Sequence, residues 1–453
     1  MGEPLAVTWK NFRGYQSPTT LEFPKLTLLI GRNNVGKTSA YAPLLLLKQT
    51  LDARDPQTNL LPVGELINAG KFHDFVHGHD TSLPIIFKLP IEPNGRRGAE
   101  DDGNSPRILE LTFTDGGMSC ELAKSRILDG YGKNIISRTR TANNSWRVDS
   151  PRLPKNSSPG RPSRDITELR SAIRNEQPRG FLFGGFPAAY IPSAWRKDES
   201  LWESARVWVD ALFDLYDIQR HVNQSMYSLL RKISYLGPLR SLPSSTYQIS
   251  PEAPTAVGRD GQFSCELLLR SKNKAVLKEV NSWLERLGYG KLKFQEHRDE
   301  FFQVLIQPAE STFPVNIAHT GVGLSQLLPI LVQGCLTEQD DTFIVQQPEI
   351  HLNPAQQCLI ADFLIERTLR GTRTIIETHS EHLLLRLRRR IAEGQISAND
   401  VAIYYCDNEN GNSTVDRIHI GQKAELERQD WPSGFFEEQL QDSIKLALAQ
   451  ARA

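Results

Sequence analysis

The 453-residue sequence has few of the features that mark exported or membrane proteins. It contains five cysteines, and no two of them form a Cys-x-x-Cys pair, which argues against a disulfide framework and against a zinc site. No apolar run reaches the roughly 18 residues of a membrane span, and residues 1–10 lack a charged segment followed by an apolar one. We therefore expect a cytoplasmic protein that does not contact a membrane.

A net charge of either sign is also missing. The chain has 53 Lys and Arg residues against 53 Asp and Glu residues, so no global positive field attracts nucleic acid, although a local patch is compatible with these totals. Hydrophobic residues make up 39% of the chain, enough for one large core or two smaller ones. The net charge therefore does not indicate which kind of molecule the chain binds.

A glycine-rich loop gives the strongest chemical signal. Residues 31–38 read GRNNVGKT and fit the pattern G-x-x-x-x-G-K-[ST], after an apolar strand at 26–30 and before a helix over 37–50 that Pro43 should bend. Backbone N–H groups of such a Walker A loop surround phosphates, Lys37 reaches the β- and γ-phosphate oxygens, and the Thr38 hydroxyl holds Mg²⁺. We expect ATP and Mg²⁺ to be bound by Asn33, Asn34, Gly36, Lys37, Thr38 and Ser39.

The segments that follow this loop predict insertions. Residues 138–165 carry many Pro, Ser, Asn and Arg and few large apolar residues, a composition that predicts a mobile insertion. Residues 198–233 place apolar side chains at helical spacing without sustaining several heptads, which predicts a helical insertion and no long coiled coil. We therefore expect an N-terminal ATPase lobe at 1–135, a mobile loop and helical insertion at 136–240, and a C-terminal ATPase lobe at 241–453.

A second motif follows an apolar strand at 341–345. Residues 346–354 read QQPEIHLNP and resemble the Walker B and D-loop region of OLD-like and RecF-like ATPases, in which two acidic residues precede Pro. The resemblance implies one carboxylate for the Mg²⁺ shell and a second that activates water. Gln346 and Gln347 stand in these places, and an amide carries no charge and cannot act as a general base.

The two amides predict slow hydrolysis with nucleotide binding retained, and hence a long-lived ATP state. Three explanations fit the sequence equally. The natural protein hydrolyses ATP poorly, or Glu349 or another residue substitutes as the catalytic group, or a carboxylate has been replaced to trap ATP.

Two further motifs complete the set. Residues 320–326 read TGVGLSQ and resemble the ABC signature motif, in which a helix starting at Ser325 would present that hydroxyl and Gly323 to the γ-phosphate held by the other subunit. Residues 378–382 read THSEH after a strand at 374–377 and resemble a switch-histidine segment, with His379 as the γ-phosphate sensor. Each alone fits an ordinary capped helix or a surface histidine, but their order is the one that an ABC ATPase requires.

The chain as a whole resembles one bacterial group. The segments 235–240, 347–352, 377–386 and 431–436 look like an uncharacterised AAA ATPase family related to the OLD and Septu ATPases. This resemblance implies an α/β ABC-type ATPase head of the SMC, RecF and OLD kind, with helical and β insertions. It also implies a homodimer or higher oligomer that serves antiviral defence beside a companion effector such as a nuclease.

Weaker signals and other function classes remain. The segment 11–13 resembles a stretch near the base and phosphates in related heads, so Arg13 is a nucleotide-binding candidate, with an exposed turn as the alternative. For His73, His77 and His79 a surface loop is favoured over a metal site.

The alternatives in function are a RecF-like repair ATPase that clamps DNA on ATP-driven dimerisation, and a scaffold that binds ATP without turnover.

Overall fold

The structure is a computed structural model that describes residues 4–92, 107–143, 145–153, 180–184, 199–270, 274–297, 300–308, 311, 313–426, 445 and 448–450. The chain forms two compact units, one of Met1–Pro4, Glu22–Thr38 and Lys232–Ala453, and one of Leu5–Leu21 and Ser39–Arg231. These units do not follow the predicted segments 1–135, 136–240 and 241–453. The strand that precedes the glycine loop belongs with the C-terminal residues, because it pairs with strands formed after residue 372.

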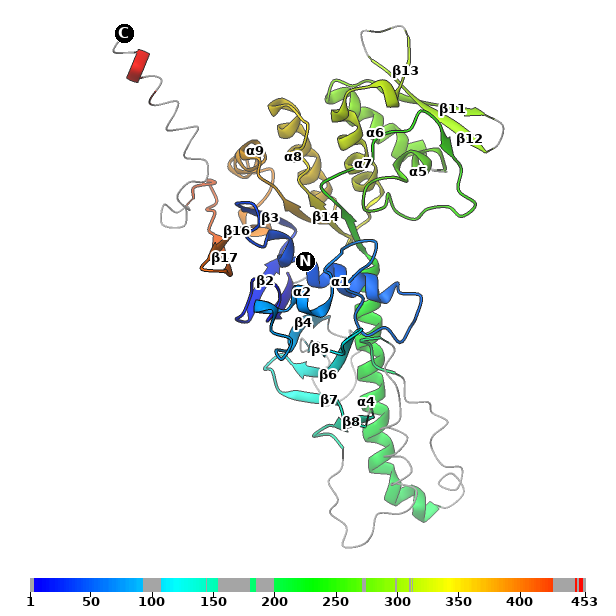
Figure 1. Cartoon of the computed structure of the whole chain (residues 1–453), viewed down its shortest axis with the longest axis vertical. Coiled ribbons are helices and arrows are strands. Elements are labelled where there is room, and N and C mark those ends of the chain that lie inside the picture. Colours follow the sequence, from blue (N-terminus) through cyan, green and yellow to red (C-terminus); the bar gives the residue numbers. More distant parts are fainter. Residues whose placement is uncertain are drawn as a thin grey trace. The chain divides into compact units, whose positions relative to one another are not determined.

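The first unit is built on a six-stranded sheet (Figure 1). Its strands are β3 (Leu26–Gly31), β9 (Ile233–Leu236), β14 (Thr342–Gln346), β15 (Arg373–Glu377), β16 (Val401–Glu409) and β17 (Asn412–Ile418). They lie in the order β17-β16-β3-β15-β14-β9, and only β17 runs antiparallel to its neighbour. Since parallel strands end at one edge of a sheet, the residues that follow β3, β14 and β15 meet there.

Helices and a smaller sheet complete this unit. The helices are α5 (Ser264–Arg270), α6 (Lys274–Arg286), α7 (Val322–Leu336), α8 (Pro354–Leu369) and α9 (Glu381–Ala392), with 3₁₀ turns η4 (Ile317–His319) and η5 (Ala398–Asp400). The small sheet has β10 (Tyr247–Gln248), β12 (Phe301–Gln307) and β11 (Lys291–His297) in that order, and β13 (Val315–Asn316) also pairs with β12. Apolar residues of β3, β14 and β15 share one core with those of α6, α7 and α8.

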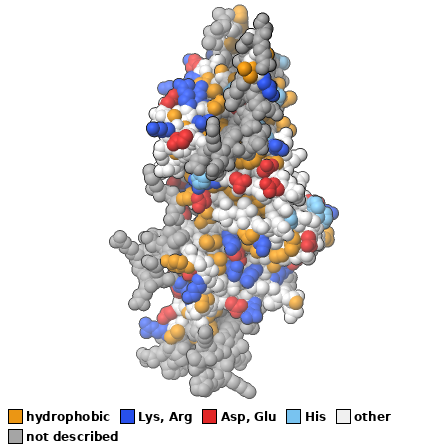
Figure 2. Space-filling model, turned by 90° about the vertical axis from the view of Figure 1, so that its left-hand side faces the viewer, with side chains coloured by type: hydrophobic (Ala, Val, Ile, Leu, Met, Phe, Trp, Pro, Cys, Tyr) orange, Lys and Arg blue, Asp and Glu red, His pale blue; other side chains and the backbone are white. Residues whose placement is uncertain are grey.

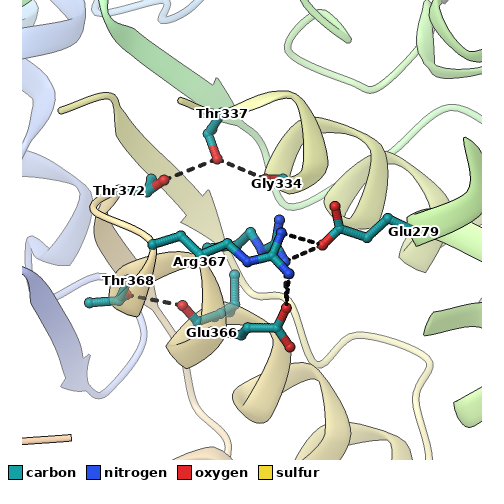
Figure 3. Close-up of polar contacts among 9 residues, drawn as sticks. Glu279, Gly334, Thr337, Glu366, Arg367, Thr368 and Thr372 are labelled. Carbon is teal, nitrogen blue, oxygen red and sulfur yellow. Dashed lines mark hydrogen bonds and ion pairs between the residues drawn. The ribbon is translucent and has the colours of Figure 1, made fainter. Parts of the chain in front are cut away.

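A buried arginine links α6 to α8. Arg367 is only 3% exposed, and its guanidinium donates to Glu279 and, at 2.7 Å, to Glu366 Oε1 (Figure 3). The Phe363 ring lies 5.2 Å from the guanidinium carbon. In the same region Thr372 Oγ1 donates to Thr337 Oγ1 at 3.1 Å, and Thr337 in turn donates to the carbonyl at the end of α7 (Figure 3). The Arg367 Nε, by contrast, is buried without a hydrogen-bond partner.

Replacing Arg367 should destabilise the chain far more than replacing its neighbour Arg370. Both guanidiniums contact Glu279 and Glu366, but the Arg370 side chain is 55% exposed and that of Arg367 is 3% exposed. We expect Arg367→Ala to lower the free energy of unfolding by about 2–3 kcal/mol, because it removes a buried side chain that packs on Phe363 and leaves a cavity, and Arg370→Ala by less than about 0.5 kcal/mol. Urea denaturation measures both, and equal losses would contradict the role of burial.

The second unit contains a sheet of seven strands in the order β2-β1-β4-β5-β6-β7-β8. The strands are β1 (Leu5–Lys10), β2 (Thr19–Phe23), β4 (Ile85–Ile91), β5 (Arg107–Asp115), β6 (Cys120–Asp129), β7 (Asn134–Arg140) and β8 (Trp146–Asp149). Alternating burial along β1 and β4 is typical of a sheet with one face packed on a core. Short helical pieces in this unit are α2 (Phe72–Phe75) and η2 (His77–His79).

The predicted helical insertion at 198–233 is confirmed as α4, which spans Glu199–Arg231. Leu215, Val222 and Leu230 of α4 are buried, and the Leu230 carbonyl accepts from Lys48 Nζ at 3.2 Å. Lys48 belongs to α1 (Ala42–Leu51), so these two helices lie in contact. In the part of the chain that the structure describes, α4 has no second long helix beside it and forms no long coiled coil.

Two local predictions differ from the structure. The helix predicted over 37–50 is divided into a 3₁₀ turn η1 (Lys37–Ala40) and α1, because Pro43 lies at the start of α1, where its missing N–H is harmless. The mobile insertion predicted from residue 138 is wrong for its first part, which forms β7 and β8. Burial of Trp146 and the stacking of Arg138 on Phe183 at 5.2 Å stabilise these strands. Residues 154–165 lie outside the described residues.

The surface matches the balanced composition. On the face drawn in Figure 2, side chains of both charge signs are interspersed among uncharged ones. Among the described helices, none combines the length and the apolarity that crossing a bilayer requires.

Candidate nucleotide-binding site

The glycine loop leaves β3 in a conformation that its glycines make accessible. Gly31 has φ 142°, and a Cβ there would lie 2.2 Å from the carbonyl oxygen of Cys406 on the neighbouring strand β16. Gly36 has φ 101° and Asn34 has φ 62°. Asn33 and Asn34 are exposed at the tip of the loop. Since any side chain at position 31 would collide with backbone, this glycine is a structural requirement of the loop.

Lys37 folds back onto the loop. Its Nζ donates to the carbonyl oxygens of Gly31 at 3.0 Å and Arg32 at 2.5 Å, and the residue is 5% exposed. Burial lowers the pKa of Lys37, and the negative charges of Glu377 and Glu349 partly offset that effect. The ammonium is therefore held by weak neutral acceptors, which phosphate oxygens can replace with stronger charged ones.

Three side chains meet where β3, β14 and β15 end. The Thr38 hydroxyl donates to Glu377 Oε2 at 3.1 Å and lies 3.4 Å from Oε1. Gln346 Nε2 donates to Glu377 Oε2 at 2.9 Å and to Thr38 Oγ1 at 3.0 Å. Glu377 is 4% exposed. The hydroxyl and carboxylate oxygens form a hard donor set of the kind that suits Mg²⁺.

Sequence reasoning gave Glu377 no role. The residue ends the strand predicted at 374–377 and begins one of the segments that resemble the OLD-related family. The sequence therefore predicted that Glu377 lies at the end of a strand. Its place beside Thr38 depends on β15 lying between β3 and β14 in the sheet. No local sequence pattern reports that order of strands.

Tyr235 and Arg240 hold the segment after β14, and sequence reasoning missed both roles. The Tyr235 hydroxyl donates to Gln346 Oε1 at 2.8 Å, which directs the Gln346 amide nitrogen toward Glu377. Burial raises the pKa of Tyr235 to about 12, so this hydroxyl stays protonated. The Arg240 guanidinium donates to the carbonyls of Gln346 and, at 3.1 Å, of Gln347. Gln347 itself adopts φ 43°, and its N–H donates to the Glu377 carbonyl at 2.6 Å.

Glu349 and His379 lie together near the same edge. Glu349 Oε1 accepts from the His379 backbone N–H at 2.8 Å, whereas its shielded Oε2 has no hydrogen-bond partner. Burial raises the pKa of Glu349. Burial also lowers the pKa of His379, and the positive charge of Lys37 lowers it further. A carboxylate with a raised pKa and a vacant oxygen is suited to accept a proton.

The helix α7 begins earlier than predicted. Gly321 is its N-cap and Val322 its first residue, whereas the sequence predicted a start at Ser325. Leu324 lies in the first turn of this helix and packs in the core. Ser325 is 4% exposed, and its hydroxyl donates to the Val322 carbonyl at 2.6 Å. The groups that face solvent at this helix start are therefore Gly321 and Val322, which is 45% exposed.

Gly323 permits a close approach in the same turn. A Cβ there would lie 2.6 Å from the Tyr289 hydroxyl and 3.1 Å from the His351 carbonyl oxygen. His351 has φ 60° and belongs to the turn between β14 and α8. Gly323 thus packs the start of α7 against the segment that follows Gln346 and Gln347.

The remaining candidates belong to the second unit. Arg13 Nη1 donates to the Ser39 hydroxyl at 3.4 Å, and Ser39 is 3% exposed. The His77 Nδ1 lies 3.0 Å from the Arg13 carbonyl oxygen, and His79 Nδ1 lies 2.8 Å from that of His73. These ring nitrogens contact backbone carbonyls, and within the described ranges no group of three His, Cys, Asp or Glu residues could hold a metal ion.

Comparison with known proteins adds two family matches. Residues 6–89 match the AAA ATPase domain, and residues 396–446 match a family described as protein of unknown function (DUF3696). No curated protein matches the chain. The segment 431–436, which resembles the OLD-related family, lies outside the described residues.

Solved structures of SMC heads are similar at low identity. The SMC head domain from Thermotoga maritima is 11% identical, covers 92% of this chain and 100% of its own, and has a TM-score of 0.37. The Smc head with an extended coiled coil bound to the C-terminal domain of ScpA, derived from Pyrococcus furiosus, is 12% identical, with 99% of both chains covered and a TM-score of 0.39. An SmcHead bound to the C-winged helix domain of ScpA is also 12% identical, with 93% of this chain and 99% of that chain covered and a TM-score of 0.39.

The structure and the family match agree on the fold. A Walker A loop follows a central strand of a largely parallel sheet, and the AAA ATPase domain matches the residues around it. The predicted fold class, α/β with a P-loop ATPase core and helical and β insertions, is confirmed.

Proposed function

We propose that this chain binds ATP and Mg²⁺ at the carboxyl edge of its six-stranded sheet and acts as an ABC-type head. The observation that carries this proposal is the meeting of Thr38, Gln346 and Glu377 within 2.9–3.4 Å of one another. Lys37 would bind the β- and γ-phosphate oxygens. Mg²⁺ bound beside Thr38 would neutralise charge on those phosphates.

Two copies of the chain would form one complete site. The solvent-facing start of α7, with Gly321 and Val322, would meet the γ-phosphate that Lys37 of the other copy holds. Free N–H groups and the positive end of the helix dipole favour such an anion. ATP would thereby close a homodimer, and loss of the γ-phosphate would open it.

The ATP-bound state would be long-lived. The two residues after the hydrophobic part of β14 are amides, which neither attract Mg²⁺ by charge nor take a proton from water. A slow or conditional ATPase of this kind can hold a companion effector, such as a nuclease, in one state until ATP is released. The assignment to antiviral defence rests on the resemblance of segments 235–240, 347–352 and 377–386 to the OLD- and Septu-related family.

DNA clamping is supported less well. The basic residues of α9 are largely engaged by carboxylates of the chain itself: Arg386 and Arg390 contact Asp362 at 3.0 and 2.7 Å, and Arg389 contacts Glu393 at 2.6 Å. Because these pairs would have to break before phosphates could replace them, α9 is a poor DNA surface. A salt-dependent affinity of the ATP-bound protein for duplex DNA would reverse this preference.

A bulky cation at the start of α7 should prevent ATP-driven dimerisation. Gly321 has φ −64°, and a Cβ there meets no atom within 4 Å, so Gly321→Arg should leave the monomer folded and its ATP affinity within about twofold. We expect the mass in solution, measured by light scattering with ATP and Mg²⁺, to double for the unmodified chain and to stay monomeric for Gly321→Arg.

Leu369→Arg is the matched control, since it places the same side chain on a 57% exposed residue at the other end of α8 from the site and should dimerise normally. Normal dimerisation of Gly321→Arg would contradict the signature role of α7. An unchanged mass of the unmodified chain on adding ATP would contradict the dimer itself.

A further inference from the structure

A buried carboxylate occupies the centre of the proposed Mg²⁺ site although the Walker B-like strand β14 ends in an amide. Glu377 ends β15, which lies between β3 and β14 in the sheet. In the parallel register of these strands Gln346 is the direct partner of Glu377. The two side chains therefore extend from neighbouring strands toward the same hydroxyl, that of Thr38.

The hydrogen bonds assign different roles to the two side chains. Gln346 uses its nitrogen to donate to Glu377 and to Thr38, and its oxygen accepts from Tyr235. With its oxygen engaged by Tyr235, the amide turns its donor, not its acceptor, toward Thr38. A group that presents N–H hydrogens repels a cation, whereas the Glu377 oxygens at 3.1 and 3.4 Å from Thr38 Oγ1 attract one.

We propose that Glu377, from the strand next to the Walker B-like strand, supplies the carboxylate of the Mg²⁺ shell, and that Gln346 positions it. The carboxylate of the site thus lies on β15 instead of β14, and Thr38 supplies the hydroxyl ligand. This inference rests on the proposed ATP–Mg²⁺ function. It explains how a chain with amides at positions 346 and 347 retains a negative charge where a divalent cation needs one.

The test compares nucleotide and metal binding in four proteins: the unmodified chain, Glu377→Gln, Gln346→Glu, and the exchanged double variant Gln346→Glu/Glu377→Gln. The exchanged variant has the same composition as the unmodified chain, with the carboxylate moved to β14. A fluorescent ATP analogue is titrated with Mg²⁺ or with EDTA, and Mn²⁺ affinity of the nucleotide complex is measured by electron paramagnetic resonance.

We expect Glu377→Gln to lower Mn²⁺ affinity by about 10- to 100-fold and to remove the effect of Mg²⁺ on nucleotide affinity. Gln346→Glu should strengthen Mn²⁺ binding, since two carboxylates then face the cation. The control is the buried Glu266 of α5, which is not part of the proposed Mg²⁺ site. Its Oε1 lies 2.7 Å from Arg270 Nε. Glu266→Gln should keep the Mg²⁺ effect.

The double variant shows whether Glu377 contacts the cation even if Glu377→Gln alone is unstable. If Glu377 faces the cation, adding Glu377→Gln to Gln346→Glu again lowers Mn²⁺ affinity by about tenfold or more. Equal Mn²⁺ affinity of Gln346→Glu and the double variant would overturn the inference, as would an unmodified chain that binds nucleotide equally well with Mg²⁺ and EDTA. An unmodified chain that binds no nucleotide would instead refute the proposed function.

Discussion

Lys37→Ala should weaken ATP binding by about 100-fold or more. The Lys37 ammonium now donates to two neutral carbonyls of its own loop and would exchange both for phosphate oxygens. Hydrogen bonds to charged groups contribute about 1.5–3 kcal/mol each, so losing two of them accounts for this factor. Titration calorimetry with ATP and Mg²⁺ measures it directly.

Lys25→Ala is the matched control for this variant. Lys25 lies directly before β3 in the same unit, its side chain is 43% exposed, and it contacts Asp400 at 3.1 Å. The substitution removes the same charge and side chain but should leave ATP affinity within about twofold. Unchanged affinity of Lys37→Ala would show that the glycine loop is not the phosphate site, and equal losses in both variants would point to an effect of net charge.

Features that depend on neighbouring residues were predictable from the sequence. The strands expected at 26–30, 341–345 and 374–377 are present as β3, β14 and β15, each shifted by no more than one residue at either end. Their apolar runs are short and bounded by polar or glycine residues, which defines a buried strand locally. The helix expected at 198–233 is likewise set by the periodicity of its own side chains.

Features that depend on distant parts of the chain were not predictable. Thr38 and Glu377 lie far apart in the sequence. The order of the strands in the sheet places the Thr38 hydroxyl 3.1 Å from Glu377 Oε2. Arg240 and Tyr235 lie in a segment noted for family resemblance, yet their contacts with Gln346 arise from the pairing of β9 with β14. The start of α7 was missed because Ser325 is a strong capping type, whereas the helix is capped at Gly321, which offers no side chain that the sequence could mark.

Glu349→Gln should abolish most of the ATP turnover without weakening ATP binding. Glu349 is shielded, has a raised pKa and keeps one oxygen without a partner, so it is the described carboxylate best prepared to take a proton from an attacking water. A glutamine of the same shape can still accept from the His379 N–H through its own oxygen, which preserves the turn. The steady-state rate should fall about 100-fold or more, while ATP affinity stays within about twofold.

Gln347→Glu separates this prediction from the alternative that the missing acidic residue limits turnover. If Glu349 is the base, turnover in Gln347→Glu still depends on Glu349, so adding Glu349→Gln to that variant again lowers the rate. If the amide at position 347 is limiting, Gln347→Glu alone raises the rate and Glu349→Gln has little effect in either background. In that case the backbone of Gln347, held at φ 43° with its N–H on the Glu377 carbonyl, already orients a residue at this position for catalysis.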